Sequence, residues 1–283
     1  MTAKLQTVLR QAQKGRYAVG AFNISDLEQA QAVVRAAVAL HAPVIINTSE
    51  KAIAYAGLEE LAAFVLAMAK KYPIPIVLTL DHGHELRLAR ACVDRGYTGI
   101  MFDASRLPFR QNVRRTAAIV RYAHRRQIGV EGELGQVKYP SEIAQDRRLV
   151  LTDPTQAHTF VRLTKVDAFA VAIGNAHGVP QAREHLDFTL LAQIKKMIDV
   201  PLVLHGASGT PPAMIRRAIH FGIAKINIDT DLRLAFSQAL RRELRRDAHE
   251  FDPRGLLGPS RDAVMATVKK KIVLFGSRNK SKS

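Results

Sequence analysis

The chain has 283 residues, of which 47% are hydrophobic and 24% are charged. This composition is ordinary for a folded globular protein and excludes a disordered tail, a collagen-like chain and a coiled coil. The net charge of +17 is compatible with polyanionic partners, with phosphorylated metabolites or with simple electrostatic solubility, and it does not choose among them.

Short runs of β-branched and apolar residues, bounded by turn residues, recur along the chain and predict strands. They are Tyr17 to Asn23, Pro43 to Ser49, Ile74 to Leu80, Tyr97 to Phe102, Ile128 to Leu134, Ala168 to Ile173, Pro201 to Leu204 and Ala224 to Ile228. Segments with helical spacing lie between them, among them Leu27 to Ala39, Leu58 to Lys70, Leu86 to Arg95 and Asn112 to Arg125.

Strand and helix alternate through the chain, and Val77 to Leu80 is apolar almost continuously, as parallel strands covered on both faces are. This α/β pattern favours a (β/α)8 TIM barrel over an open doubly wound sheet. No linker rich in Gly, Ser and Pro divides the chain, so we predict a single domain over residues 1–283. Two segments lie outside the alternation: the polar stretch from Gln136 to Arg148, a candidate mobile loop, and a basic helical extension from about residue 241.

The single cysteine, Cys92, excludes an intramolecular disulfide and a cysteine-rich zinc site. The first residues form a polar amphipathic stretch and not the apolar core of a signal peptide. Every apolar run is interrupted by Lys, Arg or Asp before it reaches the roughly 20 residues of a spanning helix. We therefore expect a cytoplasmic protein without a membrane partner.

Polar residues gather at the carboxyl ends of the predicted strands, where barrels of this kind build their active sites. They are Asp81, His82, His84, Asp103, Glu131, Glu133, Asn175, His177 and His205. A single strand-end histidine is usually an ordinary polar residue, but three of them, His82, His177 and His205, offer three imidazoles to one divalent cation. Three ligands leave the open position that a catalytic zinc needs. Asp103 and Glu133 are predicted either as ion-pair partners of arginines or as ligands of a second metal position.

The segments after the last two predicted strands carry small and hydroxyl-bearing residues. His205 is followed by Gly206-Ala207-Ser208-Gly209, and the eighth strand continues into Asp229-Thr230. Small residues let backbone N–H groups approach an anion, and these loops commonly hold phosphate in such barrels. A glycine-rich turn alone is equally typical of a tight turn, but its place beside a predicted metal ligand favours phosphate binding.

Motifs in this order resemble those of the class II, metal-dependent fructose-bisphosphate and tagatose-bisphosphate aldolases over almost the whole chain. They are Tyr17 to Asn23, Leu80 to Gly83, Phe102 to Ser105, Val130 to Gly135, Ile173 to Gly178, Leu204 to Gly206, Lys225 to Asp231 and Phe251 to Arg254.

The resemblance implies a catalytic Zn²⁺ held by His82, His177 and His205, with Asp103 and Glu133 at a second position that the metal can occupy. Asp81 is implied as the proton donor. The implied cradle for dihydroxyacetone phosphate consists of Gly178, Gly206, Ala207, Ser208, Asn227, Ile228, Asp229 and Thr230, with Asn23 and Ser49 at the sugar-facing edge. A monovalent cation is a further candidate cofactor, and a homodimer or larger homo-oligomer is expected.

The implied reaction is a retro-aldol cleavage in which zinc polarises the ketose carbonyl, so that no Schiff-base lysine is needed. Asp81 then handles the proton of the C4 hydroxyl, and Glu142, on the predicted mobile loop, is our candidate for exchanging the proton at C3. The sequence departs from the family pattern twice. After Gly135 it lacks the Gly-Gly pair and acidic residues of its relatives, and Ala207 replaces a common glycine, where its methyl group could crowd the phosphate turn.

The run from Asn227 to Asp231, the Asp81-His82-Gly83 motif and the tail from Phe251 to Arg254 resemble fructose-bisphosphate enzymes more than tagatose-bisphosphate enzymes. We therefore expect fructose 1,6-bisphosphate as the substrate and tagatose 1,6-bisphosphate as the alternative. A barrel metallohydrolase would use the same histidines but would leave the phosphate turns unexplained. A basic nucleic-acid-binding protein would use the excess charge, but no nucleic-acid module or run of stacking aromatic residues accompanies that charge.

Overall fold

The structure, a computed structural model, describes residues 2–138, 140–145, 150–178 and 186–281. Eight parallel strands form a closed barrel in chain order, with β1 and β8 completing the circle. The strands are β1 (Val19–Asn23), β2 (Val44–Ser49), β3 (Ile76–Gly83), β4 (Gly99–Phe102), β5 (Gly129–Leu134), β6 (Ala168–Val171), β7 (Leu202–Leu204) and β8 (Ile223–Ile228). The predicted (β/α)8 barrel in a single domain is confirmed.

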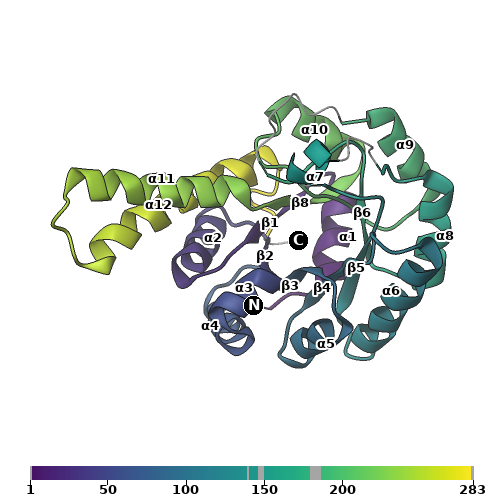
Figure 1. The fold of residues 1–283 in the computed structure, drawn as a ribbon, viewed down its shortest axis with the longest axis horizontal. Coiled ribbons are helices and arrows are strands. Elements are labelled where there is room, and N and C mark those ends of the chain that lie inside the picture. The colour runs from purple at the N-terminus through teal and green to yellow at the C-terminus, as the bar shows by residue number, and fades with distance from the viewer. Residues whose placement is uncertain (1, 139, 146–149, 179–185, 282–283) are drawn as a thin grey trace.

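Helices surround the barrel (Figure 1). They are α1 (Leu5–Gly15), α2 (Leu27–Ala39), α3 (Glu50–Ala56), α4 (Leu58–Lys71), α5 (Leu86–Asp94), α6 (Phe109–His124), α7 (Pro140–Gln145), α8 (Pro154–Thr164), α9 (Phe188–Met197), α10 (Pro212–His220), α11 (Thr230–Arg246) and α12 (Pro253–Leu274). The four helices predicted by spacing are present, although α6 begins at Phe109 instead of Asn112.

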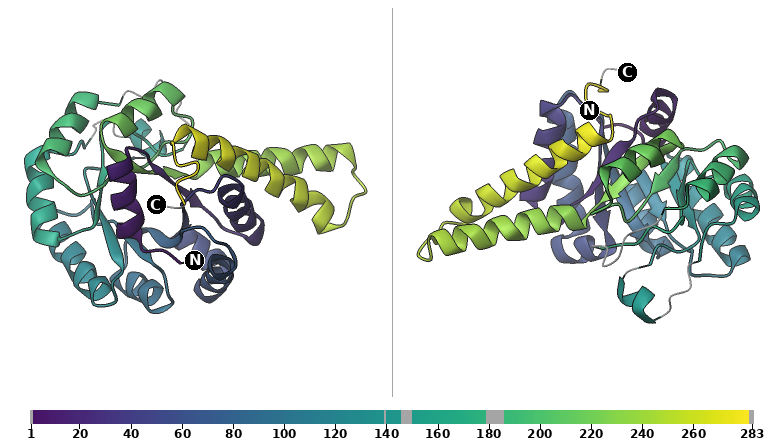
Figure 2. Two further views of the ribbon diagram at one scale, coloured as in Figure 1. Left: turned by 180° about the vertical axis from the view of Figure 1, so that it is seen from behind. Right: turned by 90° about the horizontal axis from the view of Figure 1, so that it is seen from above.

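Helix α1 covers one end of the barrel (Figure 2, left). Its apolar residues Leu5, Val8, Leu9 and Ala12 recur at helical spacing, and they are buried against small and β-branched side chains of the strands. The strand residues in this cluster are Val19, Ala21, Ile45, Val77, Ala168, Ala170, Val203 and Ala224. The barrel interior is therefore a packed apolar core at the α1 end, which leaves the opposite end for polar residues.

Strand β3 continues through Gly83, beyond its predicted end at Leu80. Its pairing with β4 shifts register between Leu80 and Gly83, which marks a bulge. Within this bulge His82 has a φ of 48°, a backbone conformation that side-chain-bearing residues seldom adopt. Bulges redirect side chains next to functional sites, and this one lies where the sequence placed the first metal ligand.

Helices α11 and α12 form an arm that projects from the barrel (Figures 1 and 2). The predicted start of the basic extension, residue 241, falls inside α11. An ion pair of 2.6 Å between Lys271 and Asp231 joins the two helices near the barrel. Phe251, between the helices, has 90% of its side chain exposed.

Much of the excess positive charge lies on the outer surface, where Arg110, Arg114, Arg121 and Arg125 of α6 are exposed. Among the described residues, no single helix has the length and apolarity needed to cross a membrane. Taken together, α3 and α4 meet that test of length and composition, but they are bent by 97° relative to each other.

Candidate active site

The three predicted metal-binding histidines meet at the carboxyl end of the barrel. His82 lies in β3, His177 follows β6, and His205 directly follows β7. Nε2 of His82 is 2.9 Å from Nδ1 of His205, and one nitrogen from each of the three rings lies within 4.8 Å of the others. Residues separated by more than a hundred positions in the sequence thus form one group that can hold a metal ion.

Two of these histidines are neutral at neutral pH, as metal ligands must be. Burial, together with the positive charges of His82 and His205, lowers the pKa of His177 to about 3. Burial and the charge of His82 also lower the pKa of His205. His82 behaves in the opposite way. Burial lowers its pKa, but the hydrogen bond to Asp103 and the charges of nearby carboxylates outweigh burial and raise this pKa to about 10.

Asp103 and Glu133 lie beside His82 and form with it a second group that can hold a metal. Oδ2 of Asp103 is 2.9 Å from Nδ1 of His82. Oε2 of Glu133 is buried and has no hydrogen-bond partner among the described residues. Burial and the nearby charge of Asp103 raise the pKa of Glu133 well above its ordinary value. A buried oxygen without a donor is costly, and a cation at this position would satisfy it.

Asp81 is fixed by two amide side chains. Asn23 donates a hydrogen bond of 2.7 Å to Oδ2, and Asn227 donates one of 2.9 Å to Oδ1. Burial raises the pKa of Asp81, but the positive charges of His82, His205 and Lys225 outweigh it and lower this pKa to about 2. Asp81 is therefore an ionised carboxylate with a defined orientation at the edge of the histidine group.

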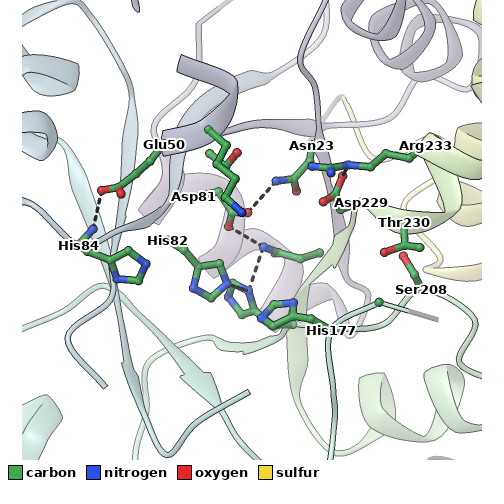
Figure 3. A pocket seen from close by; sticks show the side chains of 16 residues that line it. Asn23, Glu50, Asp81, His82, His84, His177, Ser208, Asp229, Thr230 and Arg233 are labelled. Carbon is green, nitrogen blue, oxygen red and sulfur yellow. Dashed lines mark hydrogen bonds and ion pairs between the residues drawn. The ribbon is translucent and has the colours of Figure 1, made fainter. Parts of the chain in front are cut away.

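A cavity of about 340 Å³ lies over these residues (Figure 3). It is lined by Asn23, Ser49, Glu50, Lys51, Asp81, His82, His84, His177, Gly178, His205, Gly206, Ser208, Asn227, Asp229, Thr230 and Arg233. In Figure 3, Glu50 and His84 lie on one side of the histidines, and Ser208, Thr230 and Arg233 lie on the other.

Most of the predicted substrate-binding residues line this cavity, but Ala207 and Ile228 do not, since their side chains are fully buried in the apolar core. The methyl group of Ala207 therefore points away from the turn that we expected it to crowd. Gly206 has a φ of 65°, and a side chain there would meet the carbonyl oxygen of Ala176 at 2.2 Å. This turn therefore depends on glycine at position 206.

The predicted mobile loop is described only in part, because residues 139 and 146–149 lie outside the described residues. Its helix α7 carries Glu142, which forms an ion pair with Arg106. Glu142 does not line the cavity in this structure, so its predicted role stays a prediction.

The sequence analysis assigned no role to several residues that the structure places at the site. Lys225 and Glu131 are buried and reach His205 from below, and Glu50, Lys51 and Arg233 line the cavity. Glu131 was visible as a carboxylate at a strand end. Lys225 carried no comparable signal, because a lysine inside a strand is usually assigned to the surface.

Comparisons with known proteins agree over nearly the full length. Residues 3–280 match the family model described as fructose-bisphosphate aldolase class-II. A fructose-bisphosphate aldolase from Geobacillus stearothermophilus is 38% identical over 280 residues, which is 98% of each chain. The crystal structure of the YdjI aldolase from Escherichia coli K12 superimposes with a TM-score of 0.89 at 34% identity, covering 99% of this chain and 100% of that one. The fructose-bisphosphate aldolase structure from Campylobacter jejuni, at 21% identity, shares the fold with a TM-score of 0.85 and covers 99% of this chain and 97% of that one.

Proposed function

The chain belongs to the class II fructose-bisphosphate aldolase family, and we propose that it is a zinc-dependent aldolase that cleaves fructose 1,6-bisphosphate reversibly. The products are dihydroxyacetone phosphate and glyceraldehyde 3-phosphate, which would place the protein in cytoplasmic glycolysis and gluconeogenesis. The observation that carries this proposal is the ionised, doubly held Asp81 beside three convergent histidines.

The side chains present fit a zinc ion. His82, His177 and His205 would hold it, and the unpartnered Oε2 of Glu133 supports the second position, with Asp103. When bound, the ion would act as a Lewis acid that withdraws electron density from the ketose carbonyl.

The proton chemistry at C4 falls to Asp81. In cleavage, an ionised carboxylate accepts the proton of the C4 hydroxyl as the C3–C4 bond breaks, and in condensation it returns that proton. Its lowered pKa suits the first role, and the amide groups of Asn23 and Asn227 keep both oxygens aimed while they do so. Asp81 lies on the cavity wall, where a substrate hydroxyl can reach it.

Two cationic side chains support a substrate with two phosphates. Arg233 lines the cavity beside Ser208 and Thr230, where α11 also begins, and a helix N-terminus favours an anion. Lys51 lines the cavity too and follows Glu50, which lies on the other side of the histidines. We assign the phosphate of dihydroxyacetone phosphate to the first side and the second phosphate to Lys51.

Glu142 remains our proposal for the group that exchanges the proton at C3 of the three-carbon product. Reaching the cavity requires breaking its ion pair with Arg106, whose side chain is 61% exposed. Such exposed pairs contribute only about 0–1 kcal/mol, so this pair is a weak restraint.

A coupled assay of the purified protein tests the proposal. Fructose 1,6-bisphosphate and tagatose 1,6-bisphosphate are supplied separately, before chelation, after chelation and after zinc is restored. We expect cleavage of the fructose substrate that is lost on chelation and regained with zinc. Preferred cleavage of the tagatose substrate would change the assignment of the sugar, and cleavage of neither would overturn the proposed function.

A further inference from the structure

A chain of buried polar groups runs beneath the histidines and outside the cavity. Nζ of Lys225, in β8, donates a hydrogen bond of 2.7 Å to Oε2 of Glu131, in β5. The other carboxylate oxygen of Glu131, Oε1, lies 2.8 Å from Nε2 of His205. All three side chains are fully buried. Burying an ion pair has a large desolvation cost, so a pair at this place calls for an explanation beyond stability.

The hydrogen bonds define which nitrogen of His205 carries a proton. A lysine ammonium has only donors, so Oε2 of Glu131 accepts from Lys225, and the ionised Oε1 then accepts from Nε2–H of His205. A second contact gives the same answer from the other side of the ring. Asn227 is oriented by its bond to Asp81, and its Nδ2 lies 3.2 Å from Nδ1 of His205, which must therefore accept.

We propose that Lys225 and Glu131 are positioning residues that keep Nδ1 of His205 unprotonated and turned toward the metal. This inference rests on the proposed metal site but not on the identity of the sugar. Lys225 holds Glu131 as an acceptor, and Glu131 holds the ring through Nε2. Nδ1 then faces Nε2 of His82 at 2.9 Å. Partners that orient a ligating histidine in this way commonly change metal affinity about 10- to 100-fold when removed.

The geometry argues against two other roles for these residues. Lys225 does not line the cavity, and its amino group is committed to Glu131, so it is not placed to form a Schiff base with a substrate. Both oxygens of Glu131 are also committed. Glu131 thus differs from Glu133, whose Oε2 has no partner among the residues described.

The test compares Lys225→Met and Glu131→Gln with the matched control Lys195→Met, which alters a half-buried lysine in a pocket beside α1. Zinc affinity is measured at pH 7 by competition with a chromophoric chelator. The histidine tautomers of the metal-free proteins are read from long-range ¹H–¹⁵N NMR spectra. We expect both site variants to lose about 10- to 100-fold in zinc affinity and to lose the Nε2–H signature of His205, whereas the control keeps both.

The double variant Lys225→Met/Glu131→Gln, which leaves no lone buried charge, replaces either single variant if that one does not fold. Lys225→Arg should recover part of the affinity, because it restores a cation. Folded site variants with wild-type zinc affinity and an unchanged His205 tautomer would overturn the inference. If affinity and tautomer change as expected but no bisphosphate is cleaved, the positioning pair stands and the proposed function fails.

Discussion

Nδ1 of His82 lies 2.9 Å from Oδ2 of Asp103, and this contact assigns the two nitrogens of His82 to different tasks. Nδ1 donates to the carboxylate, so Nε2 is the nitrogen that faces His205. Asp103 is itself held at Oδ1 by the backbone N–H and the hydroxyl of Ser105. Because the pKa of His82 is raised to about 10, a proton occupies Nε2 in the metal-free protein at neutral pH.

Zinc binding at pH 7 should therefore release about one proton, since a metal on Nε2 displaces the proton there. The apparent affinity should rise up to about tenfold per pH unit below pH 10, the pKa of His82. Calorimetry in buffers with different ionisation enthalpies measures the proton count. Asp103→Asn, which removes the main partner of His82, should reduce the release at pH 8. No release from the wild-type protein at pH 7 would contradict this prediction.

The stability of the metal-free protein should fall on both sides of the ordinary histidine pKa of 6.5. A raised pKa stabilises the fold fully below the unfolded value, so the contribution of His82 is lost as the pH rises toward 10. A lowered pKa acts in the opposite direction, so the contribution of His177 is present above pH 6.5 and is lost as the pH falls toward 3. Urea unfolding across this range measures both slopes, and His82→Asn should remove the alkaline loss only.

Replacing Asp81 should separate chemistry from metal binding. We expect Asp81→Ala to keep zinc and to lose about 10²- to 10⁴-fold in kcat, the usual contribution of a positioned acid or base. His205→Ala should lose zinc and activity together. Zinc titration and the coupled assay on the same preparations provide both measurements. If Asp81→Ala also lost the metal, our division of roles between these two residues would be wrong.

Lys51→Met should weaken recognition of the second phosphate. A charge-assisted hydrogen bond contributes about 1.5–3 kcal/mol, so we expect KM for fructose 1,6-bisphosphate to rise about 10- to 100-fold. KM for fructose 1-phosphate, which lacks that phosphate, should stay unchanged. Lys70→Met, an exposed substitution on α4, is the matched control. An equal rise in KM for both sugars would assign Lys51 a different role.

Glu142→Gln should slow exchange of the C3 proton of dihydroxyacetone phosphate with deuterated solvent by about 10²-fold or more. Mass spectrometry of the recovered phosphate measures this exchange without the aldehyde partner. Glu85→Gln, an exposed carboxylate elsewhere, controls for the loss of one negative charge. Arg106→Met should leave exchange intact, because Arg106 holds Glu142 only outside the cavity. Unchanged exchange in Glu142→Gln would remove it as the base.

Much of the fold was predictable because it depends on local patterns. Continuous apolar runs such as Val77 to Leu80 indicated buried parallel strands, and their alternation with helical spacing indicated a barrel. The site was predictable for a related reason. In a closed parallel barrel all carboxyl ends of the strands meet at one rim, so His82, His177 and His205 converge whatever the details of packing.

Other features were invisible to periodicity because they depend on contacts across the barrel. Glu131 and Lys225 are 94 residues apart, and their pairing requires the register of β5 through β8. The bulge in β3 that turns His82 is set by its pairing with β4, and the side of the turn that Ala207 faces is set by packing.

The sequence by itself therefore determined the barrel, the metal-binding side chains and Asp81, since these follow from strand order and residue type. Only the tertiary structure decided which nitrogen of each histidine faces the metal, through Asp103 for His82 and through Glu131 for His205. The physical reason is that a hydrogen bond fixes a tautomer only when donor and acceptor lie within about 3 Å, and such distances arise when distant strands close into a barrel.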